Sequence, residues 1–146
     1  MARNRISVMH GVNMNALDRR STEHYGDLTF TKLETRIDEF ARELGLSARF
    51  FQTNFEGEFV EELHRAAEYA DGLILNPGAW THYSYAIRDA VELAGLPAIE
   101  VHLSDVDRRE DFRKVSVIRD LCVDTVKGRG VDGYRDALQQ LAERLA

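Results

Sequence analysis

The stretch Gly72-Leu-Ile-Leu-Asn76 decides the fold class, because it is a short apolar run in which polar residues do not alternate. A strand with one face in water alternates, whereas a strand in a parallel sheet between two layers of helices is apolar throughout. Amphipathic helical patterns precede and follow this run, with apolar residues three and four positions apart. The stretch therefore predicts a parallel α/β sheet covered on both faces.

The same succession of short strands and amphipathic helices extends along the chain and predicts five β-then-α units with short connections. Right-handed crossovers between such units give a flavodoxin-like doubly wound parallel sheet, with strand order 2-1-3-4-5 and helices on both faces. Thr29 and Thr31 are both candidate caps for the first helix. Strands are expected around residues 6–10, 48–53, 72–76, 97–102 and 122–127, and helical apolar faces run through 33–44, 59–70, 86–94 and 134–145.

Composition limits the class of protein. The 146 residues suit a single domain over 1–146, and the formal net charge of −6 argues against a nucleic-acid binder. One cysteine, Cys122, excludes an internal disulfide framework and a Cys-rich zinc site. No apolar run approaches the ~20 residues of a membrane helix, and the first residues lack a secretory signal pattern. A cytoplasmic protein without a membrane partner is expected.

Polar side chains follow several of the predicted strands. Asn13 comes shortly after the first strand, Asn76 ends the third, and His82 lies six residues further on. Ligands of open α/β sheets bind beyond the carboxyl ends of the strands, so these amides and imidazoles are expected to surround a polar small molecule. The alternative is that each amide only hydrogen-bonds its own loop, and that His82 only faces water.

Glu100 and His102 lie two residues apart in the fourth predicted strand, so their side chains point to the same face of the sheet. A carboxylate beside an imidazole favours the charged ring and fixes its tautomer. Such a ring suits a general acid near neutral pH. A purely structural ion pair at the end of a strand is the alternative.

The segment 11–28 is the longest stretch without a helical or strand pattern, and long loops in compact domains are often functional. It carries Arg19, Arg20 and Tyr25. A nearby guanidinium stabilises a phenolate, so an arginine and a tyrosine on one loop can together supply a base. The alternative is a solvated surface loop.

These runs together resemble the type II 3-dehydroquinate dehydratase (type II dehydroquinase) family, in order and spacing along the whole chain. The matching runs are Gly11-Val-Asn-Met-Asn15 with Arg20 and Tyr25-Gly26, Gln52-Thr-Asn-Phe-Glu-Gly57, Asn76-Pro-Gly-Ala-Trp-Thr-His-Tyr-Ser84, Ile99-Glu-Val-His-Leu-Ser104, Arg109-Glu-Asp-Phe-Arg113 and Gly128-x-Gly-x-x-Gly-Tyr134.

The resemblance implies an anti elimination of water from 3-dehydroquinate to 3-dehydroshikimate through an enolate, with no cofactor, metal or Schiff base. It implies a role in the shikimate pathway, and so in aromatic amino acid biosynthesis, or in quinate metabolism. It also implies a homododecamer. In the catalytic positions it places Tyr25 as the base, Arg20 (less readily Arg19) as the lid arginine, Asn13 at the enolate, and His102, held by Glu100, as the acid.

The resemblance further assigns residues to the substrate. Asn76, His82 and Arg113 take the substrate-binding positions, the backbone of Leu103 and Ser104 would receive the carboxylate, and Arg109 would lie behind the site or at an interface.

The chain departs from the family pattern at Val12, Asp105 and Asp107. Two carboxylates near an anion pocket would repel an anionic substrate, which leaves open a same-fold dehydratase or isomerase acting on a related cyclic polyol. His10 also favours this alternative. A flavodoxin-like signalling module with Lys127 is a second alternative, although it would require an acidic pair after the first strand. Lys127 is also the one lysine to consider as an imine former.

Overall fold

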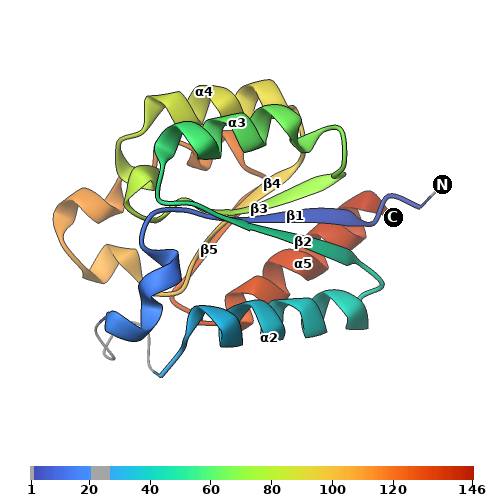
Figure 1. Ribbon diagram of the computed structural model, residues 1–146, viewed down its shortest axis with the longest axis horizontal. Coiled ribbons are helices and arrows are strands. Elements are labelled where there is room, and N and C mark those ends of the chain that lie inside the picture. Colours follow the sequence, from blue (N-terminus) through green and yellow to red (C-terminus); the bar gives the residue numbers. More distant parts are fainter. Residues whose placement is uncertain (1, 21–26) are drawn as a thin grey trace.

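Five parallel strands form one sheet in the order β2-β1-β3-β4-β5, as the sequence predicts (Figure 1). The structure is a computed structural model that describes residues 2–20 and 27–146. β3 is buried at every position, in agreement with its uninterrupted apolar run. The strands span Arg5–His10 (β1), Ser47–Gln52 (β2), Gly72–Asn76 (β3), Ala98–His102 (β4) and Asp124–Lys127 (β5).

Four α-helices cover the sheet, two on each face (Figure 1). On one face lie α3 (Glu56–Ala66) and α4 (Tyr85–Ala94), and on the other lie α2 (Phe30–Glu43) and α5 (Asp132–Leu145). Each pair buries its apolar stripe against the sheet, which produces two separate apolar cores. Within the described residues, no helix combines the length and the apolar character needed to cross a lipid bilayer.

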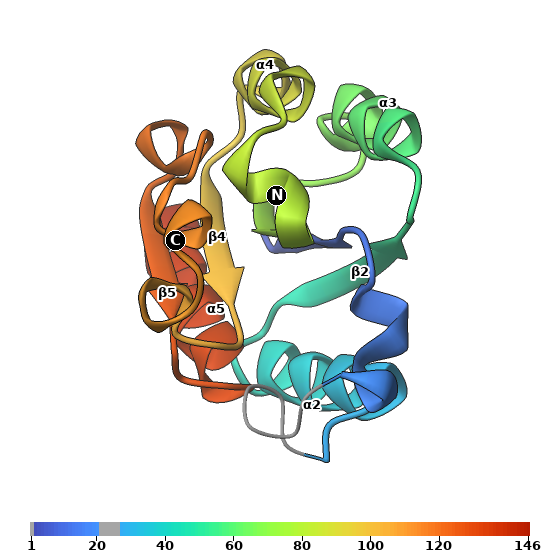
Figure 2. The same ribbon diagram turned by 90° about the vertical axis from the view of Figure 1, so that its left-hand side faces the viewer.

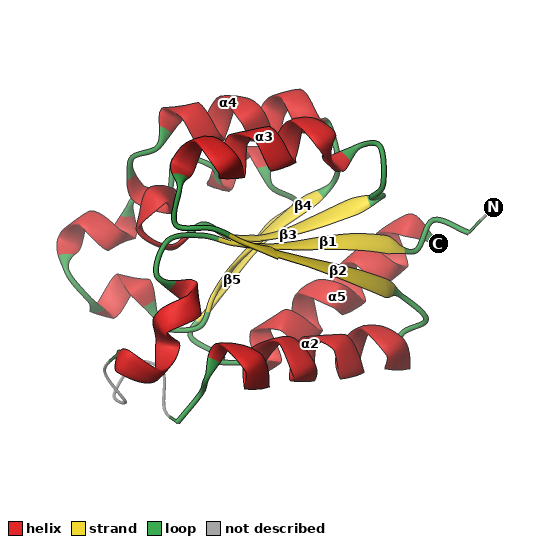
Figure 3. Ribbon diagram, in the orientation of Figure 1, coloured by secondary structure: helices red, strands yellow, loops and turns green. Residues whose placement is uncertain are grey.

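The prediction of five β-then-α units is wrong at the fourth unit. Between β4 and β5 the chain forms three short 3-10 segments and no α-helix (Figure 3). No continuous apolar stripe runs through residues 103–121, because positions 107–111 are all charged, and Phe112 and Val115 are more than half exposed at 51% and 55%. Without a stripe to bury, the segment has no reason to lie on the sheet as a helix, and it stays near the carboxyl edge. The 3-10 segments span Val106–Arg108, Asp111–Lys114 and Arg119–Leu121.

The loops after β1 and β3 are packed backbone against backbone at the carboxyl edge, which faces the viewer in Figure 2. The amide of Gly11 donates to the carbonyl of Asn76 at 2.7 Å. A Cβ at Gly11 would lie 2.1 Å from the carbonyl oxygen of Pro77, so only glycine permits this approach. Thr29 rather than Thr31 caps α2, because its hydroxyl accepts from the amide of Lys32 at 3.2 Å.

Candidate active site

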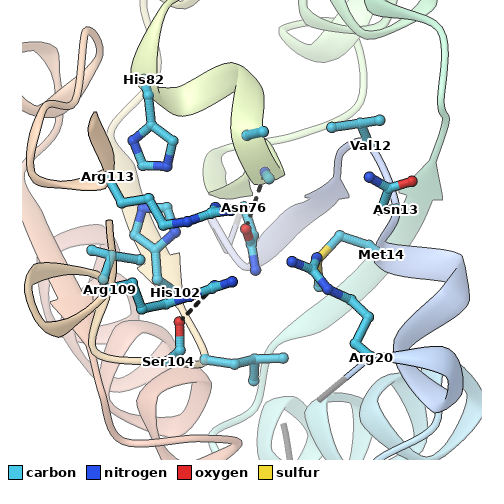
Figure 4. Close-up of a pocket in the computed structure, with 14 residues that line it drawn as sticks. Val12, Asn13, Met14, Arg20, Asn76, His82, His102, Ser104, Arg109 and Arg113 are labelled. Carbon is cyan, nitrogen blue, oxygen red and sulfur yellow. Dashed lines mark hydrogen bonds between the residues drawn. The ribbon is translucent and has the colours of Figure 1, made fainter. Parts of the chain in front are cut away.

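A cleft lies at the carboxyl edge of the sheet (Figure 4). Loops after β1, β3 and β4 supply its walls, as expected for an open α/β sheet. Among the described residues that line it, three are arginines, two are histidines and none carries a carboxylate. The cleft therefore favours an anionic ligand. Its lining comprises Val12, Asn13, Met14, Arg20, Asn76, Gly78, Ala79, His82, His102, Leu103, Ser104, Val106, Arg109 and Arg113.

Asn13 and its loop are held by residues at and just after the end of β2. Its backbone is left-handed, with φ of 68°, and its amide N–H donates to Oδ1 of Asn54 at 2.8 Å. Gln52 donates from Nε2 to the carbonyl of Gly11 at 3.2 Å. These bonds restrain the loop around Val12, one of the positions where the chain departs from the family pattern. No role was predicted from the sequence for Gln52 or Asn54, although their place at the end of a strand was a usable signal.

Asn76 at the end of β3 has a fixed side-chain amide. Its Oδ1 accepts from the amide of Gly78 at 3.2 Å, and its Nδ2 donates to the hydroxyl of Tyr134 at 3.2 Å. Tyr134 belongs to α5 and is fully buried, and this burial raises the pKa of its phenol although the bond from Asn76 opposes the rise. One amide hydrogen of Asn76 is left for the cleft, where Figure 4 shows its nitrogen. The alternative that Asn76 hydrogen-bonds only its own loop is therefore incomplete, because Asn76 also bonds Tyr134 of α5.

His102 and Glu100 form the predicted pair on one face of β4. The distance from Nε2 of His102 to Oε2 of Glu100 is 2.5 Å, and the carboxylate is completely buried. Burial alone would raise the pKa of Glu100, but the hydrogen bonds from His102 and Ser116 and the charge of His102 outweigh it and lower the pKa. Because Nε2 is engaged, Nδ1 of His102 is the ring nitrogen left to meet a ligand.

The imidazole of His82 lies beside that of His102, with ring centroids 6.4 Å apart and planes inclined by 19° (Figure 4). Its Nδ1 is 2.7 Å from the carbonyl of Val115, which makes Nδ1 the protonated nitrogen. Burial lowers the pKa of His82 more than this bond raises it, and the positive charges of His102 and Arg113 lower it further. A neutral His82 therefore offers Nε2 as an acceptor for a ligand hydroxyl.

The three arginines enter the cleft from two sides (Figure 4). Arg20 comes from the loop after β1, and it, not Arg19, lines the cleft. Arg113 pairs through Nε with Glu110 at 3.1 Å. The expectation that Arg109 lies behind the site is wrong, because Arg109 is part of the lining and donates from Nη1 to Oγ of Ser104 at 3.4 Å. Its guanidinium can therefore act on the ligand directly.

The backbone after His102 is restrained by the glycine-rich turn that follows β5. The carbonyl of Leu103 accepts from Gly130 at 3.0 Å, and that of Ser104 accepts from Gly128 at 3.1 Å. Gly128 has φ of +75°, and a Cβ there would lie 3.1 Å from Cβ of Asp105. The turn therefore requires glycine, and it holds Leu103 and Ser104 against the floor of the cleft.

The two carboxylates that favoured another substrate are engaged elsewhere. Asp107 pairs with Lys127, which lowers the pKa of Asp107, and Asp105 pairs with Arg108 at 3.3 Å. Neither aspartate lines the cleft, and Lys127 does not line it either. The two aspartates therefore give no electrostatic reason against an anionic ligand in the cleft. Lys127 is not placed to form an imine with a ligand bound there.

His10 does not join the cleft, although it ends β1. Its ring is completely buried on the α2 face, with centroids 5.0 Å from Phe30 and 6.2 Å from Tyr134. Burial lowers its pKa to about 3, so the ring is neutral. His10 therefore gives no support to a different ligand. Tyr25 lies outside the described residues.

Comparison with known proteins identifies what this arrangement is similar to. The sequence profile described as dehydroquinase class II matches residues 4–142. A protein named 3-dehydroquinate dehydratase, from Pelotomaculum thermopropionicum, is 50% identical over 138 residues, which cover 94% of this chain and 96% of the relative. The crystal structure of the type II dehydroquinase from Propionibacterium acnes aligns with a TM-score of 0.90 at 39% identity, over 97% of this chain and 98% of that one. The type II dehydroquinase from Butyrivibrio crossotus also gives a TM-score of 0.90, at 37% identity, over 94% and 97% of the two chains.

Proposed function

The chain belongs to the class II dehydroquinase family, and from that premise we propose that it dehydrates 3-dehydroquinate to 3-dehydroshikimate by an anti elimination through an enolate. The enzyme is a hydro-lyase of the 3-dehydroquinate dehydratase kind. One observation carries the mechanistic proposal: the buried Glu100–His102 pair stands at the wall of a cleft that is rich in guanidinium groups. Such a cleft suits a carbocycle that bears hydroxyl groups and one carboxylate.

The lining of the cleft can recognise each part of this substrate. The backbone of Leu103 and Ser104 is proposed to receive the carboxylate, with the charge of Arg109 beside it. Asn76 donates its remaining amide hydrogen to a ring oxygen, and neutral His82 accepts from a hydroxyl. The predicted substrate role of Arg113 fits its place in the lining.

The elimination requires a base, a donor to the enolate and an acid. Tyr25, with its phenolate stabilised by Arg20, removes the proton at C2, and the electron pair moves into the adjacent ketone to form an enolate. Asn13 is proposed to stabilise that enolate oxygen. When the enolate collapses, the bond from the ring to the neighbouring hydroxyl breaks, and His102 protonates this group so that it leaves as water. Glu100 stabilises the imidazolium before the transfer.

Turnover can be tested directly, because the product is a conjugated enone and the substrate is not. Purified protein should convert 3-dehydroquinate with a rise in ultraviolet absorbance. Tyr25→Phe should lose nearly all of this activity while it retains the fold, because only the ionisable oxygen is removed. An active Tyr25→Phe variant would disprove the role of Tyr25. Inactivation by borohydride in the presence of substrate would indicate a lysine imine instead.

We also propose that residues 1–146 act as a single domain and that the chain assembles into a homododecamer, as the resemblance implies. Exposed apolar side chains support an assembly, since Tyr83, Tyr85 and Phe112 are 59%, 68% and 51% exposed. Sedimentation analysis should give a species of about twelve chains, and a monomer at micromolar concentration would contradict this. Supply of the shikimate pathway or breakdown of quinate is the proposed physiological context.

A further inference from the structure

The hydroxyl of Ser116 has a fixed direction. Its Oγ accepts hydrogen bonds from the amides of Ile118 at 3.3 Å and Arg119 at 3.1 Å. A serine hydroxyl has two acceptor lone pairs and one hydrogen, so both lone pairs are occupied. The hydrogen is then directed to the third neighbour, Oε1 of Glu100, at 2.7 Å.

Glu100 is consequently bonded on both of its oxygens, to His102 through Oε2 and to Ser116 through Oε1. A carboxylate that is completely removed from water stays ionised only where hydrogen bonds or opposite charges replace the lost hydration. The charge of Arg119 also lowers the pKa of Glu100, while burial and the negative charge of Glu100 raise the pKa of the Cys122 thiol. On the other side of His102 lie the ring of His82 and the guanidinium of Arg113.

We propose that Ser116 is a positioning residue for the reaction: its directed hydroxyl keeps Glu100 ionised and in place, and Glu100 in turn orients and charges His102. The inference rests on the proposed function, in which His102 is the acid. Ser116 itself does not line the cleft, so it acts only through Glu100. It belongs to the irregular segment between β4 and β5, which brings it next to a residue sixteen positions earlier in the chain.

A simpler role for Ser116 must be distinguished, because its bonds to the amides of Ile118 and Arg119 also hold the start of the 3-10 segment Arg119–Leu121, as a helix cap would. A cap contributes to stability and leaves the pH dependence of turnover unchanged. A donor to Glu100 changes the pH dependence of turnover. Ser84 provides a matched control, because its hydroxyl is also buried and caps α4 by accepting from Ile87 at 3.1 Å.

The experiment compares the pH profile of kcat/KM, followed by enone absorbance, in the wild type, Ser116→Ala and Ser84→Ala. In Ser116→Ala the acidic limb should move up by about one pH unit, because the ionised form of Glu100 loses a charge-assisted bond. At neutral pH kcat should fall by about tenfold, with a smaller change in KM. Ser84→Ala should retain the wild-type limb.

A second pair keeps the inference testable if Ser116→Ala does not fold. Ser116→Thr retains the hydroxyl and Ser116→Val has the same shape without it, so Thr should restore the wild-type profile and Val should not. The acidic limb of the Val variant should lie at higher pH than that of the Thr variant, whatever their turnover at neutral pH. Coincident profiles in all variants, or an equal shift in Ser84→Ala, would overturn the inference. If His102→Asn kept full turnover, the proposed function would fail instead.

Discussion

Two histidines end two strands of one sheet, and their surroundings are opposite. His102, at the end of β4, is bonded to a buried carboxylate at 2.5 Å and lines the cleft. His10, at the end of β1, is packed among aromatic rings, and neither ring nitrogen has a hydrogen-bond partner within the described residues. The carboxylate of Glu34 lies 4.0 Å from Nε2 of His10. The neighbours of an imidazole, rather than its place at a strand end, decide whether it can exchange protons.

Exchange of each histidine for asparagine gives the largest expected difference between the two regions. His102→Asn should reduce kcat by about a thousandfold, because the general acid is lost and the fold is not. His10→Asn should stay within about threefold of the wild type, because the ring lies on the α2 face of the sheet and does not line the cleft. Steady-state kinetics with thermal melting of both variants would check this. Comparable losses in the two variants would contradict the contrast.

Stability should depend on pH through His10. Its pKa is about 3 in the folded protein and 6.5 in an exposed chain, so only the unfolded chain gains a proton between these values. The free energy of unfolding should therefore fall as the pH drops below 6.5, by up to about 1.4 kcal/mol per pH unit, with no contribution from His10 above that value.

Urea unfolding at several pH values, in the wild type and in His10→Asn, isolates this effect. The carboxylates, including Glu34, titrate in both proteins, so the difference between the two slopes belongs to His10. Equal slopes below pH 6.5 would show that His10 accepts a proton in the folded protein.

A smaller effect is expected at Tyr134, a residue of the apolar core beneath α2 and α5 that bonds Asn76 of the cleft. Tyr134→Phe removes the acceptor of Asn76, whose amide can then rotate, and kcat/KM should fall by about tenfold. Tyr69→Phe is the matched control, because it removes a hydroxyl that bonds Glu62 away from the cleft. The role of Tyr134 would be refuted if both variants kept wild-type kinetics.

The smallest effect is expected for the aspartates near the cleft. Asp107→Asn should change KM for 3-dehydroquinate by less than about twofold, because Asp107 is directed to Lys127 and its pair is partly exposed. A KM several-fold lower than that of the wild type would mean that the charge of Asp107 reaches the substrate. Measurement at low ionic strength makes the test sensitive, since salt screens such interactions.

Local patterns account for most of the fold. Short apolar runs, alternating or continuous, predicted the strands, and apolar residues at a spacing of 3.6 predicted the four helices of the described residues. Both patterns arise because the residues on a buried face must be apolar and recur with the period of the element. The connection between β4 and β5 was expected to contain a helix and does not. The charged run 107–111 interrupts its apolar residues, so no continuous stripe remains for a helix to bury.

For the site, the pairing of Glu100 and His102 followed from the sequence alone, since two residues of one strand with one residue between them share a face in any sheet. Distant contacts did not follow. The bond from Tyr134 to Asn76 joins residues 58 positions apart, and Arg109 enters the cleft through a segment without periodicity. The sequence by itself determined the order of the strands and the types of residue at their ends. Only the tertiary structure decided that the carboxylate bonded to His102 is buried, that His10 is buried among aromatic rings, and that Asp105 and Asp107 pair with cations outside the cleft. The reason is that desolvation and charge depend on neighbours that only the folded chain brings together.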